Sequence, residues 1–185
     1  MVSPSPQPRP RAGNSASVAL VLGGARSGKS RFAESLLAGH AGQRVYLATA
    51  QAGDEEMRQR IAEHRKRRGN DWRTIEAPLD IASPIAEASG DAILIDCLTL
   101  WLSNLMAAGL NIDQAVDGLC KALGKARAPI VLVSNETGLG IVPDNALARE
   151  FRDHAGRLNQ SVAAIADRVF FVAAGLPLTL KDNAA

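Results

Sequence analysis

The chain is short of cysteine, of aromatic side chains and of net charge. Its 185 residues include two cysteines and 4% aromatic residues, and the formal net charge is +2. Cys97 and Cys120 are too few and too far apart for a disulfide scaffold or a zinc site. Because both lie in apolar contexts, we interpret them as buried thiols in a reducing compartment. The small net charge gives no indication of nucleic-acid binding.

Long apolar runs are also missing. No stretch approaches the roughly 20 residues that are needed to cross a bilayer, so we expect no membrane span. Residues 1–17 carry four prolines and two arginines but no apolar segment of the kind that a secretory signal contains. We therefore predict a disordered, proline-rich extension over residues 1–17, one domain over residues 18–185, and a cytoplasmic location.

One glycine-rich motif stands between an apolar run and a helical pattern. The run is Val18–Leu22, and the motif is Gly23-Gly24-Ala25-Arg26-Ser27-Gly28-Lys29-Ser30. This is the phosphate-binding loop G-x-x-x-x-G-K-[ST], in the strand–loop–helix context that the motif requires. The glycines let backbone N–H groups point at an anion, Lys29 reaches the β- and γ-phosphates, and the Ser30 hydroxyl binds Mg²⁺. The motif predicts a nucleoside triphosphate site.

The rest of the chain alternates between expected strands and expected helices. We predict strands at residues 18–22, 44–48, 72–75, 92–96, 129–134, 168–173 and 178–180. We predict helices at residues 29–38, 54–67, 98–106, 112–125 and 144–166, and a further one with Ser83 as N-cap and Pro84 at its first position. The alternation indicates an α/β fold: a single-domain P-loop NTPase-type fold with a mostly parallel central sheet flanked by helices.

Two of the expected helices are unusual. The helix at 98–106 is apolar on more than one side, which fits either the core or a contact with a partner subunit. The helix at 54–67 is polar, with Met57 and Ile61 as its clear apolar anchors. A helix of that composition faces solvent or substrate rather than the core.

Asp96 and the segment Asn135–Gly140 end two of the apolar strands. Ligands bind at the carboxyl ends of the strands in such sheets. We therefore interpret Asp96 as the acid that supports Mg²⁺, in preference to a cap on the following helix near Thr99. Asn135–Gly140 has three polar groups and two glycines, which favours a loop that contacts substrate.

His64 lies within a basic run on the polar helix, Arg60-Ile61-Ala62-Glu63-His64-Arg65-Lys66-Arg67-Arg68. Neighbouring cations favour the neutral imidazole, which is a competent nucleophile toward phosphorus. On composition alone, a solvated basic helix with an inert histidine is the better interpretation. Nucleic-acid binding is less well supported still, because the run has no interleaved aromatic residues.

Many collinear blocks of this sequence resemble one family, the bifunctional adenosylcobinamide kinase / adenosylcobinamide-phosphate guanylyltransferases of cobalamin biosynthesis. The resemblance runs from about Ser17 to Lys181. The matching blocks are residues 23–31, 46–49, 60–65, 72–76, 96–105, 133–136, 140–143, 148–153 and 156–160.

The resemblance implies two reactions. In the first, ATP or GTP phosphorylates the aminopropanol hydroxyl of adenosylcobinamide. In the second, GMP passes from GTP to that phosphate, giving adenosylcobinamide-GDP and pyrophosphate. Members form a guanylyl intermediate on a histidine, and the alignment makes this residue His64, which reverses the interpretation from composition alone.

The same alignment implies the residues that contact GTP. They are Gly23–Ser30, the turn Ala48-Thr49-Ala50, Arg65, Lys66, Arg67, Arg68, Glu76 and Asp96. Arg65 and Lys66 are suited to hold the transferred phosphoryl oxygens. The resemblance also implies Mg²⁺ as cofactor and a homo-oligomer, with a trimer as the expected form.

Two other functions are compatible with the phosphate loop. One is a small-molecule kinase that uses no covalent step. The other is a nucleotide-dependent switch or ATPase module that acts on a partner. Retention of label from α-labelled GTP on the denatured protein separates the first interpretation from both.

Overall fold

The computed structural model describes residues 17–51, 53, 55, 58–59, 62–63, 66, 71–88 and 91–183. The strands are β1 (Val18–Gly23), β2 (Arg44–Ala48), β3 (Trp72–Glu76), β4 (Ala92–Asp96), β5 (Ile130–Asn135), β6 (Arg168–Ala173) and β7 (Leu176–Asp182). The helices are α1 (Lys29–Ser35), α3 (Ala82–Glu87), α4 (Leu98–Ala107), α5 (Ile112–Lys125) and α6 (Ala146–Ile165).

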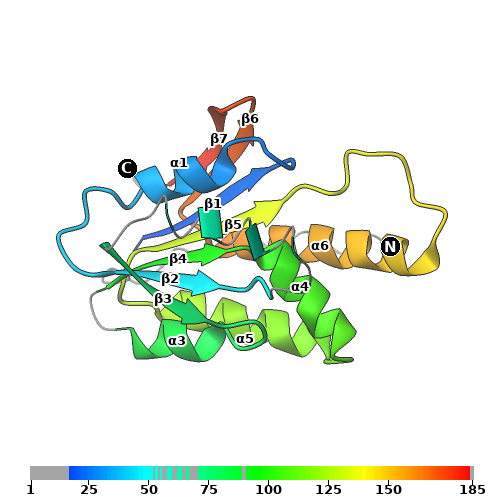
Figure 1. Cartoon of the computed structure of the whole chain (residues 1–185), viewed down its shortest axis with the longest axis horizontal. Coiled ribbons are helices and arrows are strands. Elements are labelled where there is room, and N and C mark those ends of the chain that lie inside the picture. Colours follow the sequence, from blue (N-terminus) through cyan, green and yellow to red (C-terminus); the bar gives the residue numbers. More distant parts are fainter. Residues whose placement is uncertain are drawn as a thin grey trace.

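These strands form one seven-stranded sheet in the order β3-β2-β4-β5-β1-β6-β7. All neighbouring pairs are parallel except β6 and β7, which form an antiparallel hairpin at one edge. Parallel pairing brings the carboxyl ends of the first six strands to the same edge of the sheet. Figure 1 shows the arrowheads of β2, β3, β4 and β5 pointing to that edge.

Strand β1 is buried on both faces, as its nearly continuous apolar sequence requires. Val18, Leu20 and Leu22 pack in the larger core cluster, with side chains from α3, α4, α5 and α6. Ala19 and Val21 point the other way and pack in the cluster that contains Ala33 of α1. Helices therefore cover both faces of the sheet, with α1 on one side and α3 and α5 on the other (Figure 1).

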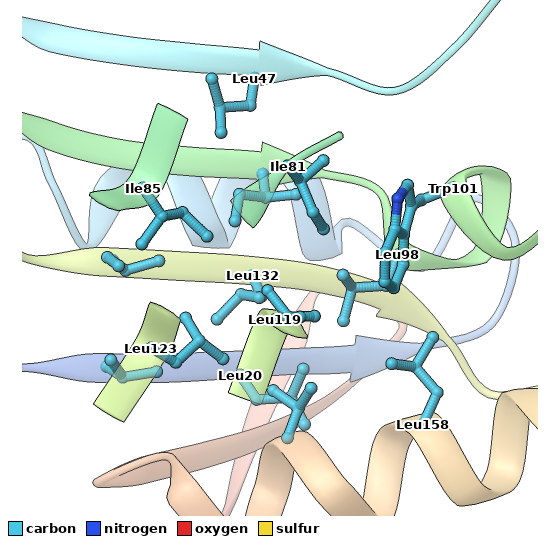
Figure 2. Close-up of a cluster of buried hydrophobic side chains, with 14 of the residues drawn as sticks. Leu20, Leu47, Ile81, Ile85, Leu98, Trp101, Leu119, Leu123, Leu132 and Leu158 are labelled. Carbon is cyan, nitrogen blue, oxygen red and sulfur yellow. The ribbon is translucent and has the colours of Figure 1, made fainter. Parts of the chain in front are cut away.

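The larger cluster extends across the sheet (Figure 2). Leu20, Leu47 and Leu132 come from three different strands, and Leu119 and Leu158 come from the helices that cover them; each is at most 1% exposed. Replacing one such leucine by alanine costs about 2–5 kcal/mol, because a cavity is left behind. The core therefore fixes the strands whose ends carry the polar residues.

The predicted α/β fold with a mostly parallel sheet is confirmed. Several predicted boundaries are wrong. Strand β7 runs over Leu176–Asp182 rather than over residues 178–180, because its pairing with β6 begins at Ala173 and Leu176 and continues to Arg168 and Asp182. Helix α1 ends at Ser35 rather than at residue 38, because the amides of Leu37 and Ala38 bond to the carbonyls three residues earlier, which tightens the last turn. Helix α3 begins at Ala82. The Asp80 carboxylate accepts hydrogen bonds from the N–H groups of Ala82 and Ser83, both at 3.0 Å, so Asp80 rather than Ser83 supplies the capping side chain.

The apolar helix α4 belongs to the core. Its large buried side chains are Leu98, Trp101, Leu102 and Leu105. These side chains pack inside the domain and are therefore not available for contact with a partner subunit. Of the cysteines, Cys97 is buried as predicted, whereas Cys120 is only half-buried; both are free thiols.

Parts of two predicted segments lie outside the described residues. In the predicted proline-rich extension, residues 1–16 lie outside. Ser17 is described, and its carbonyl oxygen accepts a hydrogen bond from the Ile130 N–H at 2.9 Å. In the predicted polar helix, Met57 and Ile61 are also outside. Its described residues are helical and exposed, and they are Glu55, Arg58, Gln59, Ala62, Glu63 and Lys66.

Candidate nucleotide site at the carboxyl edge of the sheet

The phosphate loop follows β1, which lies between β5 and β6 in the sheet. Gly23 has no room for a side chain, because a Cβ there would lie 2.5 Å from the Val172 carbonyl oxygen. Gly28 has φ 95°, a left-handed conformation that favours glycine, and it stands at the N-cap of α1. The two glycines therefore serve different purposes: one allows close packing and the other allows the turn into the helix.

Two further contacts hold the loop in shape. The Lys29 Nζ donates a hydrogen bond to the Gly24 carbonyl oxygen at 2.9 Å, so the ammonium group lies over the loop. The Gly175 N–H, in the turn between β6 and β7, donates to the Ser27 carbonyl oxygen at 2.8 Å. Arg26 adopts φ 55°, which is uncommon for a residue with a side chain. Contacts within the chain therefore support the shape of the loop.

Asp96 ends β4, which is separated from β1 by β5 alone. It is half-buried, and the next residue, Cys97, occupies the N-cap position of α4, so Asp96 is not itself that N-cap. Burial and, secondly, the charge of Asp96 raise the pKa of Cys97 to about 11, while the charge of Lys29 acts in the opposite direction. The strand-end acid and the loop lysine therefore both lie within electrostatic range of one thiol.

Ser30 and Asp96 are the two residues that the sequence predicts as ligands of a magnesium ion. Ser30 lies in the first turn of α1, and a hydroxyl and a carboxylate are the hard oxygen donors that Mg²⁺ prefers. Among the described residues, no three His, Cys, Asp or Glu side chains gather into a metal site. An ion held by these two oxygens would therefore take its remaining ligands from nucleotide phosphates and water.

The turn Ala48–Ala50 and Glu76 lie side by side at the same edge. Ala48 is paired with both Glu76 and Asp96 in the sheet. The Thr49 hydroxyl donates to the Cys97 carbonyl oxygen and accepts from the Cys97 N–H, both at 2.8 Å, which fixes the end of β2 to the end of β4. Three strand ends that the sequence assigned to GTP contact are thus brought together.

Asn104 is a residue of this region that the sequence analysis did not single out. Its Nδ2 donates to the Thr49 carbonyl oxygen at 2.8 Å and to the Pro78 carbonyl oxygen at 3.0 Å. It therefore ties the turn after β2 to the turn after β3. The signal in the sequence is a lone amide within an otherwise apolar helix.

Strand β5 ends between the phosphate loop and Asp96. Asn135 is paired with Gly23, and the Glu136 N–H donates to the Gly23 carbonyl oxygen at 3.2 Å. The Thr99 hydroxyl accepts from the Asn135 N–H at 2.7 Å, and the buried Asn159 donates to the Asn135 carbonyl oxygen at 3.2 Å. The segment predicted to contact substrate is therefore fixed directly beside the phosphate loop.

The predicted nucleophile lies outside the described residues. The residues outside are His64, Arg65, Arg67 and Arg68. Lys66 is the one predicted basic contact that the structure describes, and it is helical and exposed. Of the predicted GTP contacts, those that the structure brings to one edge are Gly23–Ser30, Ala48, Thr49, Ala50, Glu76 and Asp96.

Comparison with known proteins identifies the family to which this chain belongs. The family model described as cobinamide kinase / cobinamide phosphate guanyltransferase matches residues 19–180. The chain belongs to this family. It is therefore a transferase, and the resemblance stated from the sequence is confirmed.

Curated relatives cover nearly the whole chain. The bifunctional adenosylcobalamin biosynthesis protein CobP of Pseudomonas aeruginosa is 52% identical over 169 residues, which is 89% of this chain and 97% of that protein. The bifunctional adenosylcobalamin biosynthesis protein CobU of Salmonella typhimurium is 45% identical over 179 residues, which is 88% of this chain and 98% of that protein. The family match over residues 19–180 thus includes nearly all of the seven-stranded sheet.

A solved structure from Pyrococcus horikoshii OT3 shares the fold. It superposes with a TM-score of 0.50 at 10% identity and covers 93% of this chain and 88% of that chain. At this identity the likeness concerns architecture alone. No helix in the described part of the chain is both long enough and apolar enough to cross a membrane.

Proposed function

We propose that this protein phosphorylates adenosylcobinamide and then guanylylates the product, with both steps at the carboxyl edge described above. The observation that carries the proposal is the family match over residues 19–180, together with an intact phosphate loop at Gly23–Ser30. The proposed substrates are ATP or GTP, adenosylcobinamide and adenosylcobinamide phosphate.

In the first step the substrate hydroxyl oxygen attacks the γ-phosphorus, the γ-phosphorus–oxygen bond to the β-phosphate breaks, the hydroxyl proton passes to water, and the nucleoside diphosphate leaves. Lys29 and the backbone of the phosphate loop hold the β- and γ-phosphates, where negative charge develops as the bond breaks. Ser30 and Asp96 would hold Mg²⁺, which supplies further charge neutralisation on the phosphate oxygens. These two residues also orient the triphosphate relative to the strand ends.

In the second step His64 attacks the α-phosphorus of GTP, and pyrophosphate leaves. A phosphate oxygen of adenosylcobinamide phosphate then attacks the same phosphorus, and the P–N bond to His64 breaks. The imidazole is regenerated, and adenosylcobinamide-GDP is formed. Arg65, Lys66, Arg67 and Arg68 follow His64 in the sequence, and we propose that they hold the transferred phosphoryl oxygens.

The turn Ala48–Ala50 and Glu76 are proposed to contact the guanine nucleotide. Support comes from their neighbouring positions at the strand ends and from Asn104, which holds Thr49 and Pro78 together. We also propose that the protein is a homo-oligomer, with a trimer as the expected form. Leu176, Leu178 and Leu180 are more than half exposed on the edge strand β7, which supports a contact between copies there.

One labelling experiment tests the covalent step. The protein is incubated with Mg²⁺ and GTP labelled at the α-phosphate and is then denatured. We expect label that stays on the polypeptide, survives alkali and is lost in acid, and that is absent from His64→Ala. No label on the wild-type protein would contradict guanylyl transfer through histidine, and cobinamide phosphorylation without label would favour a plain kinase.

Oligomerisation is tested separately. Light scattering at working concentrations should give a mass above that of one chain. A monomer that is fully active would contradict the proposed assembly.

A further inference from the structure

The segment that runs from the end of β5 into the first turn of α6 exposes four large apolar side chains. They are Leu139, Ile141, Val142 and Leu147, which are 81%, 98%, 62% and 64% exposed. We call this set the apolar apex. Single exposed apolar residues are common on protein surfaces, whereas four within nine residues are a local concentration of exposed apolar side chains, which is a feature of binding surfaces.

Hydrogen bonds from α6 hold the backbone that carries the apolar apex. Arg149 donates to the carbonyl oxygens of Pro143 at 2.9 Å and Asp144 at 2.6 Å, and Arg152 donates to the Gly138 carbonyl oxygen at 3.2 Å. Asn145 caps α6 by accepting the Ala148 N–H at 3.1 Å. Two arginines of α6 thus support the backbone of the loop, and the apolar side chains on that backbone are exposed to water. A surface ordered in advance loses less conformational entropy when a ligand binds.

The start of the loop is fixed to the nucleotide site. The Glu136 side chain accepts the Gly138 N–H at 2.5 Å, and the Glu136 N–H donates to the Gly23 carbonyl oxygen of the phosphate loop. Figure 1 shows the loop, in yellow, projecting beyond the carboxyl edge of the sheet next to the end of β1. The apolar apex therefore extends the nucleotide site outward.

We propose that the apolar apex binds the corrin ring of the cobinamide substrate. The inference rests on the proposed function and adds a place for the second substrate. A corrin is a large macrocycle with apolar faces and an amide-bearing rim, whereas phosphates require N–H groups and cations. The apex offers apolar side chains to the ring face, and its loop begins at Glu136, whose N–H bonds to the Gly23 carbonyl oxygen, so a substrate bound there lies at the same edge of the sheet as the phosphate loop.

The test compares two exposed apolar sites. Ile141→Asn and Val142→Asn remove apolar surface from the apex, and Leu110→Asn makes the same kind of change in the α4–α5 connection, where Leu110 is 47% exposed. We expect KM for cobinamide to rise about tenfold in each apex variant, with KM for ATP within about twofold of wild type. Leu110→Asn should change neither constant, and the thermal midpoint and the mass in solution should stay unchanged in all three variants.

Three results would overturn the inference. The first is an unchanged KM for cobinamide in both apex variants. The second is a rise in KM that accompanies dissociation of an oligomer, since the apex would then be a contact between copies of the chain. The third is a wild-type protein that does not phosphorylate cobinamide, which would remove the proposed function and not merely the place of its substrate.

Discussion

Two loops leave neighbouring strands at the same edge of the sheet and present opposite chemistry. The phosphate loop after β1 is rich in glycine, is packed against the β6–β7 turn and offers backbone groups and a lysine. The loop after β5 offers exposed apolar side chains on a backbone supported by Arg149 and Arg152. One loop suits phosphates, and the other suits an apolar ring.

The difference shows how one sheet edge can serve a reaction with two unlike substrates. β1 and β5 are hydrogen-bonded along their whole length, from Val18 paired with Ile130 to Gly23 paired with Asn135. The register of this pair sets the relative position of the two loops. Chemistry is therefore divided between the loops, while the core holds them at a fixed spacing.

The largest effect is expected from removing the charge of the phosphate loop. Lys29→Ala should lower both the kinase and the guanylyl-transfer rates by ~100-fold or more, because both need the triphosphate charge neutralised. Rates with each nucleotide donor give the measurement. If guanylyl transfer survives while kinase activity is lost, the two reactions do not share this loop.

A smaller effect is expected from adding one carbon to the same loop. Gly23→Ala places a Cβ 2.5 Å from the Val172 carbonyl oxygen, so the loop must shift, whereas a Cβ at Gly24 has no atom within 4 Å. Gly23→Ala should lower the free energy of unfolding by about 1–3 kcal/mol and weaken nucleotide binding. Gly24→Ala is the matched control and should unfold at the wild-type temperature.

The arginine support of the second loop should have a still smaller effect. Arg149→Ala removes hydrogen bonds to the Pro143 and Asp144 carbonyl oxygens. We expect KM for cobinamide to rise about fivefold, which corresponds to roughly 1 kcal/mol, and nucleotide affinity to stay unchanged. Equal losses for both substrates would mean that the loop acts through the nucleotide site.

The smallest effect at neutral pH concerns the buried thiol of Cys97, at the start of α4. Burial raises the pKa of Cys97 from 9.0 to about 11, so the protonated thiol stabilises the fold below pH 9. This stability is lost as pH rises from 9 through 11, and the loss amounts to roughly 2–3 kcal/mol. Denaturant titrations at pH 7 to 11 should show a shallower decline in Cys97→Ala than in wild type. Parallel declines would contradict the raised pKa.

The sequence predicted the sheet and the phosphate loop because both depend on local patterns. Strands buried on two faces read as apolar runs, and the loop needs glycine and lysine at fixed spacing. It also predicted which strand ends carry polar side chains, from Asp96 and Asn135. Parallel pairing alone then brings those ends to one edge.

Contacts between segments that are distant in the sequence could not be predicted from it. Nothing in the spacing of Asn104 indicates that it joins Thr49 to Pro78, since this depends on how α4 crosses the strand ends. The start of α3 was misplaced because Ser83 and Asp80 are both plausible caps, and tertiary packing selects between them. The apolar apex was not predicted either, because an apolar residue in a loop gives no sign of its exposure.

On this account the two loops bind different substrates. Titration calorimetry of Lys29→Ala and Ile141→Asn, each with a non-hydrolysable GTP analogue and, separately, with cobinamide, measures the two affinities independently. We predict that Lys29→Ala loses affinity for the nucleotide alone and that Ile141→Asn loses affinity for cobinamide alone. Loss of both affinities in either variant would contradict the division of the site between the two loops.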